Sequence, residues 1–246
     1  MKRAAVFSGG GARCMAQLGY LSFLKEMGVE FECYSGVSGG AIVASFLAKG
    51  YKPKEIFEIL KSIDYKKLIK LNIFGGSIFH LKKVYPLLRD FGLKDFSDLK
   101  YKLYVAVTDY ETYETIYRDS GDLAKYLIAS SSLIPVFSPF EVDGRVYIDG
   151  GFTDNLPVTP CVDSDFILAI NVNPPLRFKN SLWGNFYRAG YIMLNTNIRY
   201  SKQKAHKYVE IKKCGVFSIF DTKNFDKIYE AGYEEAENDI EFWKRI

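Results

Sequence analysis

The sequence predicts an α/β sandwich, and three observations lead to this fold class. Predicted strands and helices alternate through most of the chain, the order found where helices cover a sheet. Residues 166–172 are almost entirely apolar, as in a parallel strand that is buried on both faces. The 246 residues are 48% hydrophobic and 25% charged, a composition that suits a packed core and argues against wholesale disorder.

Glycines mark the ends of the predicted elements in the first part of the chain. In order, these elements are a strand over residues 3–8, a turn over 9–11, a helix over 12–27, a strand that ends near Gly36, and helices over 39–49 and 53–62. Apolar residues recur at near-helical spacing in the first helix, which Gly28 stops, and Gly50 ends the second. Pro53 stands in the first turn of the third helix, where no hydrogen bond is lost.

The remaining elements continue the alternation. They are a buried strand over residues 103–108, a neighbouring strand over 113–117, a helix over 122–131, a hairpin over 141–148, the apolar strand 166–172, and helices around 182–206 and 225–244. Asp143 and Gly144 supply the tight turn of the hairpin. Length and the lack of a linker predict a single domain over residues 1–246.

Several classes of protein are excluded. No apolar stretch approaches the roughly 20 residues that a membrane-spanning helix needs. The basic start Met1-Lys2-Arg3 is not followed by the apolar region of a signal peptide, because residues 8–11 interrupt it. We therefore expect the chain to remain inside the cell. The four cysteines form no CxxC pair and there are two histidines, so a zinc site is not expected.

Positive and negative charges are concentrated in different segments of the sequence. Residues 49–102 carry a net charge of +7 and residues 176–213 of +8, whereas residues 103–175 carry −8. Both basic segments hold many aromatic side chains, a combination typical of a membrane interface. Two interpretations stay open: solvated helix faces, or contact with an anionic membrane surface. Nucleic acid is not expected as a partner, because no motif for it is present.

The first motif with chemical meaning is Gly9-Gly10-Gly11-Ala12-Arg13. Glycines between a strand and a helix expose backbone N–H groups where the helix dipole is positive, so they can bind a phosphate or a developing oxyanion. Arg13 either adds a charged donor or holds the loop. The alternatives are a plain turn and a dinucleotide site, for which Glu30 has the right spacing but Cys14 replaces the third glycine.

The second motif, Gly36-Val37-Ser38-Gly39-Gly40, has the GxSxG pattern. It follows a predicted strand and opens a predicted helix, the setting of a nucleophile elbow that projects a serine hydroxyl. An ordinary serine in a glycine-rich turn is the alternative.

A nucleophilic serine needs a base. A Ser–Asp–His order is formally available as Ser38, then Asp149 or Asp165, then His206. We do not favour it, because His206 lies in a basic stretch expected at an exposed helix end, and His80 is expected at a helix start or partly buried. The third motif, Asp149-Gly150-Gly151, ends a predicted strand, and its carboxylate could accept the serine proton directly.

Together these motifs resemble the patatin-like phospholipase family. GGGxR, GxSxG and DGG occur in that family's order, and residues 129–139 and 149–158 resemble two further family segments. The resemblance covers residues 4 to about 173. It implies a three-layer α/β/α sandwich with a mostly parallel central sheet.

The resemblance also implies roles for individual residues. Ser38 would be the nucleophile and Asp149 its base, with no histidine and no metal or organic cofactor required. The elbow would depend on Gly36 and Gly40, and the dyad loop on Gly150 and Gly151. The oxyanion hole would be formed by the backbone N–H groups of Gly9, Gly10 and Gly11, with Arg13 nearby.

Two features depart from the family pattern. Cys14 stands where the family usually has glycine. Residues 49–102 and 176–246 match no motif, and we expect them to cover the site and to select the acyl chain.

The expected function is therefore a serine acyl hydrolase of phospholipase, lysophospholipase or esterase type that acts on lipid acyl esters, with a possible peripheral contact to an anionic membrane. Three alternatives stay open. Acyl transfer and thioester hydrolysis would use the same acyl-enzyme, and the third alternative is a non-catalytic lipid- or nucleotide-binding module on the same fold.

Overall fold

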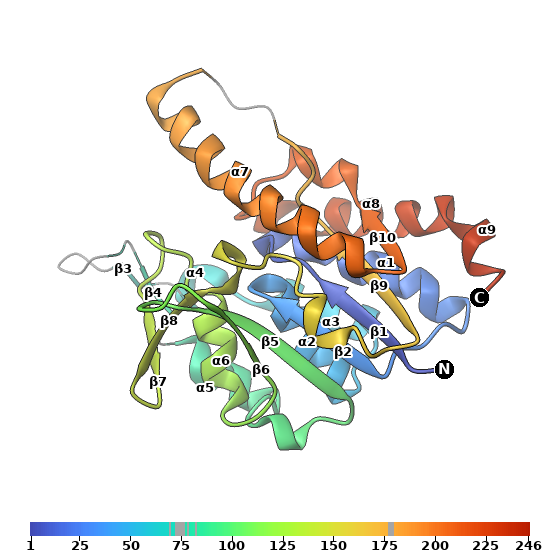
Figure 1. Ribbon diagram of the computed structural model, residues 1–246, viewed down its shortest axis with the longest axis horizontal. Helices are drawn as coiled ribbons and strands as arrows, with labels where there is room; N and C mark the ends of the chain where they lie inside the picture. The colour runs from blue at the N-terminus through green and yellow to red at the C-terminus, as the bar shows by residue number, and fades with distance from the viewer. Residues whose placement is uncertain (69, 72–76, 78, 82, 177–179) are drawn as a thin grey trace.

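The computed structural model describes the whole chain except residues 69, 72–76, 78, 82 and 177–179. Its centre is a sheet in the order β10-β9-β1-β2-β5-β8-β7, with β6 paired to β5 (Figure 1). The strands are β1 (Arg3–Phe7), β2 (Cys33–Val37), β5 (Lys102–Asp109), β6 (Thr115–Arg118), β7 (Phe140–Val142), β8 (Arg145–Asp149), β9 (Phe166–Asn171) and β10 (Lys207–Glu210).

The sheet is parallel on one side and antiparallel on the other. Strands β10, β9, β1, β2 and β5 run parallel, with Phe7 opposite Gly36 and Ile170 in the registers of β1. Strands β6 and β8 both run antiparallel to β5, and β7 to β8. Because β8 is antiparallel, its last residue, Asp149, lies opposite Val107 of β5.

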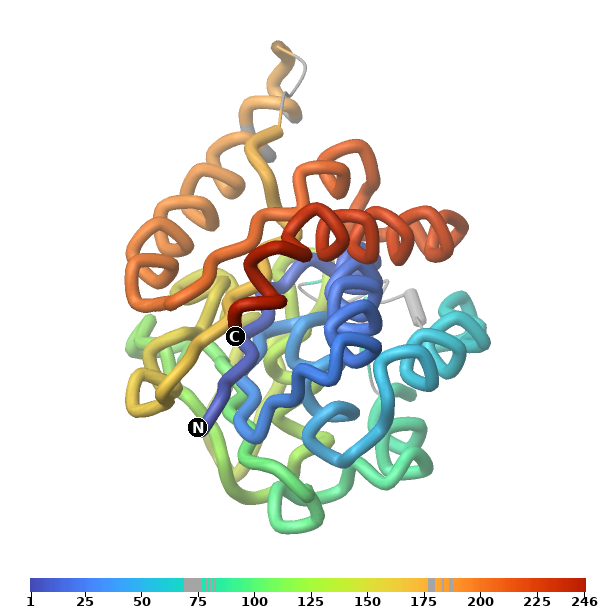
Figure 2. The backbone as a smooth tube through the Cα atoms, turned by 90° about the vertical axis from the view of Figure 1, so that its right-hand side faces the viewer, coloured from blue at the N-terminus to red at the C-terminus, as the bar shows by residue number. Residues whose placement is uncertain are grey.

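One face of the sheet carries most of the helices (Figures 1 and 2). They are α1 (Met15–Glu26), α2 (Gly39–Lys49), α3 (Pro53–Ser62), α5 (Val84–Asp90), α6 (Leu123–Ser130), α8 (Phe225–Asn238) and α9 (Ile240–Trp243). Helix α8 lies beside α1 although the two are far apart in sequence. Ala5 and Phe7 of β1 face this layer and belong to the main hydrophobic core.

The other face is covered by α7 (Leu182–Ser201) and by the short helical turns η3 (Gly150–Phe152) and η4 (Thr159–Cys161). Ala4 and Val6 of β1 face this layer, in a smaller core that includes Ile198 of α7. Helix α7 projects beyond the sheet at its upper end (Figure 1). Helices on both faces of a mostly parallel sheet confirm the three-layer α/β/α sandwich that the sequence predicts.

Local sequence signals placed most elements correctly. Helices α2 and α3 have the predicted bounds, and Gly50 ends α2 with a left-handed φ of 106°. Other predictions were wrong in detail. The strand predicted over 113–117 is β6, which begins at Thr115, and the helix predicted around 225–244 is divided at Asp239 into α8 and α9. Residues 11–14 form the 3₁₀ turn η1 before α1 begins, and the helix predicted to reach residue 206 ends at Ser201. The chain then passes through η5 (Lys202–Lys204) and pairs as β10 with the open edge of β9.

The segment 49–102 contains further short elements, α4 (Tyr65–Leu68), β3 (Lys70–Leu71), β4 (Phe79–His80) and η2 (Phe96–Asp98). Residue 80, expected at a helix start or partly buried, therefore lies in a short strand that pairs with β3. Its side chain lies outside the described residues, as do the side chains of Trp183, Phe186 and Tyr187. Across the described parts of the chain, no helix has the length and apolar character needed to cross a membrane.

Candidate active site

Ser38 stands in the sharp turn between β2 and α2. Its backbone angles, φ 53° and ψ −130°, are ones that a residue with a side chain adopts at a cost. Two glycines make the turn possible. A Cβ on Gly36 would lie 2.5 Å from the Gly40 carbonyl oxygen, and a Cβ on Gly40 would lie 2.4 Å from the Ser8 carbonyl oxygen. The strand–turn–helix geometry is thus that of a nucleophile elbow.

A second serine holds the backbone of Ser38. The Ser38 N–H donates to Ser130 Oγ at 2.8 Å, and Ser130 Oγ–H donates to the Ala106 carbonyl oxygen at 2.7 Å. Helix α6 and strand β5 therefore both restrain the strained turn. The sequence contained Ser130 within a recognised segment, but its link to Ser38 requires two segments to meet in space.

Asp149 ends β8 with its carboxylate directed at Ser38. The carboxylate accepts a hydrogen bond from the Gly151 N–H at 2.8 Å, and the Ser38 side chain is near enough to lower the pKa of the carboxyl. Asp149 is 4% exposed, and this burial raises the pKa of its carboxyl from 3.8 to about 6, although the Gly151 N–H and the Ser38 side chain oppose the shift. A base whose pKa lies just below neutral pH is ionised there and still accepts a proton readily.

The glycine loop, residues 9–11, turns its carbonyl groups toward protein donors. Asn173 Nδ2 donates to the Gly9 carbonyl oxygen at 2.6 Å, and the Arg13 N–H donates to that of Gly10 at 3.2 Å. The N–H groups of Ser8 and Ala12, on either side, are also used. By contrast, within the described residues no protein acceptor is recorded for the N–H groups of the three glycines. Such a run of unpaired N–H groups forms an anion-binding cradle.

The glycine loop lies directly against the elbow. The position that a Cβ on Gly9 would take is 3.2 Å from Ser38 Cβ, and the corresponding position on Gly39 is 3.2 Å from the Gly11 nitrogen. Ser38, Asp149 and the glycine loop therefore form one cluster, which we call the serine–aspartate cluster. Helix α2 also begins at Ser38, so the positive end of its dipole faces the same place.

Arg13 is turned away from this cluster. Its Nε donates to the Phe217 carbonyl oxygen at 2.8 Å, and its Nη1 donates to Tyr191 Oη at 3.3 Å and Asn173 Oδ1 at 3.5 Å. Of the two roles considered for Arg13, holding the loop is the one that these contacts describe. The guanidinium fastens the glycine loop to α7 and to the segment that follows η6 (Lys212–Val216).

Cys14, which stands where the family usually has glycine, fits without distorting the loop. Its Sγ lies 3.7 Å from the Ser8 carbonyl oxygen and 2.9 Å from the position of a Cβ on Gly39. Burial raises the pKa of the thiol far above its usual range. The side chain therefore remains a neutral packing group between α1 and the elbow.

Asn155 was not singled out from the sequence. Its side chain is buried between the glycine loop and the loop after Asp149: Oδ1 lies 2.6 Å from the position of a Cβ on Gly9 and 2.7 Å from that on Gly151. Its Nδ2 has no partner within the described structure, whereas its backbone N–H donates to Asn197 Oδ1 of α7 at 3.0 Å. A buried amide without a hydrogen-bond partner marks a candidate functional residue, and it can be recognised only from the packed structure.

Asn173 was also missed, although a sequence signal existed. It follows the buried strand β9, and polar residues after the carboxyl ends of parallel strands gather at one edge of the sheet. Its Nδ2 reaches the Gly9 carbonyl oxygen, so it orients the glycine loop.

The residues of the alternative triad lie at the opposite edge of the sheet. Asp165 accepts from the Lys2 N–H, and His206 Nδ1 accepts from the Ile167 N–H at 3.1 Å, next to the start of β9. Glu30 precedes β2 and pairs with Lys25, so it also lies at the edge away from the glycine loop. Neither a triad through His206 nor a dinucleotide site through Glu30 is assembled.

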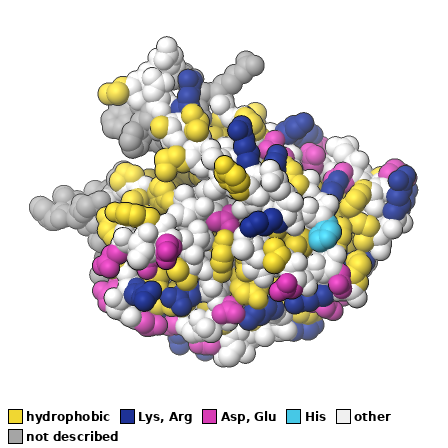
Figure 3. Space-filling model, in the orientation of Figure 1, with side chains coloured by type: hydrophobic (Ala, Val, Ile, Leu, Met, Phe, Trp, Pro, Cys, Tyr) yellow, Lys and Arg dark blue, Asp and Glu magenta, His cyan; other side chains and the backbone are white. Residues whose placement is uncertain are grey.

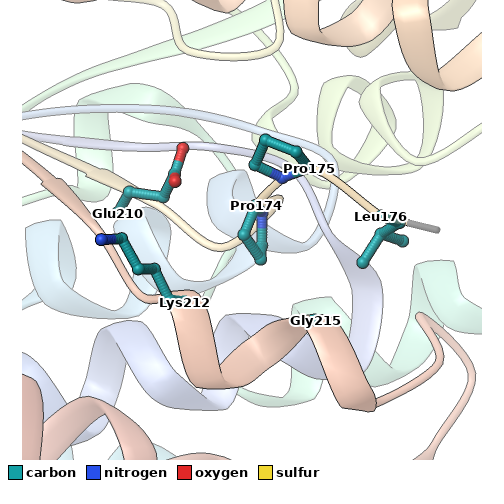
Figure 4. A pocket seen from close by; sticks show the side chains of 6 residues that line it. All are labelled: Pro174, Pro175, Leu176, Glu210, Lys212 and Gly215. Atoms are coloured by element: carbon teal, nitrogen blue, oxygen red, sulfur yellow. The ribbon is translucent and has the colours of Figure 1, made fainter.

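A hollow of about 450 Å³ lies beside the cluster but contains neither Ser38 nor Asp149 (Figure 4). It is lined by Pro174, Pro175, Leu176, Glu210, Lys212 and Gly215. These residues follow β9 and β10, so the hollow opens at the same carboxyl edge of the sheet as the glycine loop.

The fold and the cluster define the class: an α/β sandwich with a serine–aspartate pair at the carboxyl edge of its parallel strands. A family model described as patatin-like phospholipase matches residues 5–162, which is more than half of the chain. The chain belongs to the patatin-like phospholipase family, as its motifs predicted.

Curated relatives agree with this assignment. An uncharacterized NTE family protein of Mycobacterium bovis is 30% identical over 69% of this chain and 49% of its own length. A lysophospholipase, nte1, of Aspergillus niger is 25% identical over 98% of this chain and 18% of its own length. The chain thus spans half or less of the length of these relatives.

Two solved structures share the fold. VipD from Legionella pneumophila matches with a TM-score of 0.65 at 16% identity, over 96% of this chain and 66% of that one. ExoU from Pseudomonas aeruginosa, in its complex with SpcU, matches with a TM-score of 0.54 at 15% identity, over 100% of this chain and 52% of that one. At such identities the likeness concerns the fold alone.

Proposed function

We propose that the protein is a serine acyl hydrolase that cleaves acyl esters of lipids, with Ser38 as nucleophile and Asp149 as general base. The observation that carries this proposal is the position of Ser38 beside the buried Asp149 carboxyl, whose pKa the Ser38 side chain lowers. The three N–H groups of the glycine loop lie next to them and have no protein acceptor among the described residues. Membership of the patatin-like phospholipase family and the lysophospholipase among the relatives support a lipid substrate.

The first half of the reaction transfers the acyl group to Ser38. Ser38 Oγ attacks the ester carbonyl carbon while its proton passes to the Asp149 carboxylate. The carbonyl oxygen becomes an oxyanion, which the N–H groups of residues 9–11 stabilise; loss of one such donor typically costs about 10²–10³ in rate. The intermediate collapses, the alcohol leaves with the proton held by Asp149, and an acyl-enzyme remains.

The second half releases the acid. Water attacks the acyl carbonyl carbon and gives its proton to Asp149, and the same N–H groups receive the second oxyanion. Collapse then expels Ser38 Oγ, which recovers a proton from Asp149. Ser130 and Asn173 act as positioning residues, because they hold the Ser38 N–H and the Gly9 carbonyl group.

Labelling with a fluorophosphonate probe tests this proposal without knowledge of the substrate. We expect covalent label on Ser38 in the wild-type protein and in His206→Ala, and none in Ser38→Ala. The label should be lost or strongly slowed in Asp149→Asn, because the hydroxyl then has no base. Label that is lost in His206→Ala, or an unlabelled wild-type protein in the presence of vesicles, would contradict the dyad.

A further inference from the structure

The exposed apolar side chains are concentrated beside the serine–aspartate cluster. Six of the large apolar residues that are exposed lie on α7 or on the segment from the last residue of η6 to the start of η7 (Thr222–Asn224): Leu182, Ile192, Met193, Tyr200, Val216 and Phe220. Leu182 and Val216 are each 84% exposed. Exposed apolar residues that gather on one part of a fold mark an interaction site more often than scattered single residues do.

The apolar residues of α7 share one face. Leu182, Ala189, Met193 and Tyr200 recur at intervals of seven, four and seven residues, which places them on one side of a helix. The opposite side, with Ile198 at 2% exposure, packs on the sheet. The helix therefore has an inner apolar face that is buried in the core and an outer apolar face that remains exposed.

Only basic charges accompany this outer face. The sequence has no acidic residue between Asp165 and Glu210, and α7 carries Arg188 and Arg199, both exposed. Figure 3 shows hydrophobic and basic side chains next to one another on the projecting part of the molecule. A helix that presents apolar residues with arginines at their margin has the chemistry of an interfacial helix on an anionic bilayer. A contact between two copies of this face would instead bring arginines together with no acidic residue of α7 to pair with them.

Helix α7 reaches the site through its inner side. The Arg13 guanidinium contacts Tyr191 of α7 and the Phe217 carbonyl group, so α7 and the segment that carries Val216 and Phe220 both lie next to the glycine loop. The Ile219 carbonyl oxygen, between Phe217 and Phe220, accepts from the Ala12 N–H at 2.8 Å. A surface bound here would lie at the carboxyl edge of the sheet, where Ser38 is.

We propose that the outer face of α7, with Val216 and Phe220, is the docking surface by which the protein lies on an anionic lipid bilayer. This inference rests on the proposed function, because it names the physical form in which the lipid substrate is met. It assigns the contact to residues of the segment 182–220 rather than to the basic segment 49–102. Apolar side chains would enter the headgroup region while Arg188 and Arg199 meet anionic headgroups.

Flotation with vesicles tests this inference. Wild-type protein is mixed with vesicles of phosphatidylglycerol and phosphatidylcholine, or of phosphatidylcholine alone, and compared with Ile192→Asp/Met193→Asp. We expect the wild type to prefer the anionic vesicles and the double variant to bind them about 30-fold more weakly, since two charges of the wrong sign face the bilayer. Val162→Asp is the matched control, because Val162 is exposed but lies before β9, at the other edge of the sheet.

Each outcome separates the two proposals. The double variant should keep wild-type turnover of a soluble short-chain ester and wild-type labelling of Ser38. Equal binding of wild type and double variant to anionic vesicles would overturn the docking surface and leave the hydrolase proposal standing. A wild-type dimer that the double variant splits, with vesicle binding unchanged, would assign the face to a second copy instead. Wild-type protein that binds vesicles but hydrolyses no ester would overturn the function alone.

Discussion

The serine–aspartate cluster and the outer face of α7 are built in opposite ways. In the cluster almost every atom is constrained: a Cβ on Gly40 would meet the Ser8 carbonyl oxygen at 2.4 Å, and Asp149 is 4% exposed. On α7, Gly190 has no atom within 4 Å of its Cβ position, and Leu182 is 84% exposed. Arg13, next to the glycine loop, contacts the inner side of the same helix through Tyr191.

The two regions therefore place different constraints on the residues that form them. In the cluster, backbone geometry decides the residue, so small changes there should cost activity or stability. On α7 the chemical character of the surface matters and the individual shape matters less, so neutral changes should be tolerated and charge changes should alter binding.

The largest effect is expected for Asp149→Asn, which should lower turnover by about 10⁴ or more because the base is lost. The same change should stabilise the fold at pH 8. Burial raises the pKa of Asp149 to about 6, so the folded protein holds a destabilised carboxylate at high pH. A shift of roughly two units corresponds to at most about 3 kcal/mol.

The sign of that stability effect depends on pH. The neutral acid favours the folded state below the unfolded pKa of 3.8, and this advantage is lost as pH rises through about 6. Thermal unfolding of wild type and Asp149→Asn at pH 4 and pH 8 should therefore show a gain for the variant at pH 8 alone. A difference in stability between variant and wild type that is the same at both pH values would place the carboxylate in a less buried setting.

The second largest effect concerns pH and activity. If Asp149 must be ionised to accept the serine proton, kcat/KM should fall about tenfold per pH unit below 6 and level off above it. At pH 4 the rate should be about 100-fold below its plateau. The rate of Ser38 labelling between pH 4 and 8 measures this, and a rate that falls as pH rises would argue against a carboxylate base.

Gly40→Ala tests the constrained side of the comparison directly. The added methyl group would meet the Ser8 and Phe7 carbonyl oxygens at 2.4 and 2.8 Å, and both belong to the backbone at the end of β1. We expect a loss of about 3 kcal/mol in the free energy of unfolding, measured in urea. A folded, active variant would show that the elbow has more freedom than its contacts indicate.

Asn155→Asp should have a smaller, more specific effect. The Cβ position of Gly151 lies 2.7 Å from Asn155 Oδ1 and 3.1 Å from Asp149 Oδ1, so the two side chains face the same small space. A second carboxylate there should raise the pKa of Asp149 and move the midpoint of the pH–rate profile upward by about one unit or more. Asn155→Ala is the control, because it removes the amide without adding charge; an equal shift in both variants would exclude the electrostatic cause.

The smallest effect is expected on α7. Gly190→Ala places a methyl group in open space within a helix, so it should raise the free energy of unfolding by about 0.5–1 kcal/mol and leave the labelling of Ser38 unchanged. Urea denaturation of Gly190→Ala and Gly40→Ala side by side compares the two regions directly. The same substitution should raise the free energy of unfolding on α7 and lower it in the cluster.

By itself, the sequence determined the elements and the motifs, because their signals are local. Gly28 and Gly50 follow the ends of helices, Pro53 starts one, and the apolar run that begins at Phe166 forms the buried parallel strand β9. The order of GGGxR, GxSxG and DGG, with the matching segments 129–139 and 149–158, predicted the family, and the alternation of strands and helices predicted the sandwich.

The tertiary structure alone decided which distant residues meet. Ser130 holds the Ser38 N–H, Asn173 turns the Gly9 carbonyl group, and Asn155 fills the space between two glycines, because strands β1, β2, β5 and β9 end at one edge of the sheet. The same holds for the exposed face of α7: its apolar spacing is present in the sequence, but only packing shows which side of the helix the core covers. Local patterns record what a segment can form, and the burial of each side chain depends on what the rest of the chain places beside it.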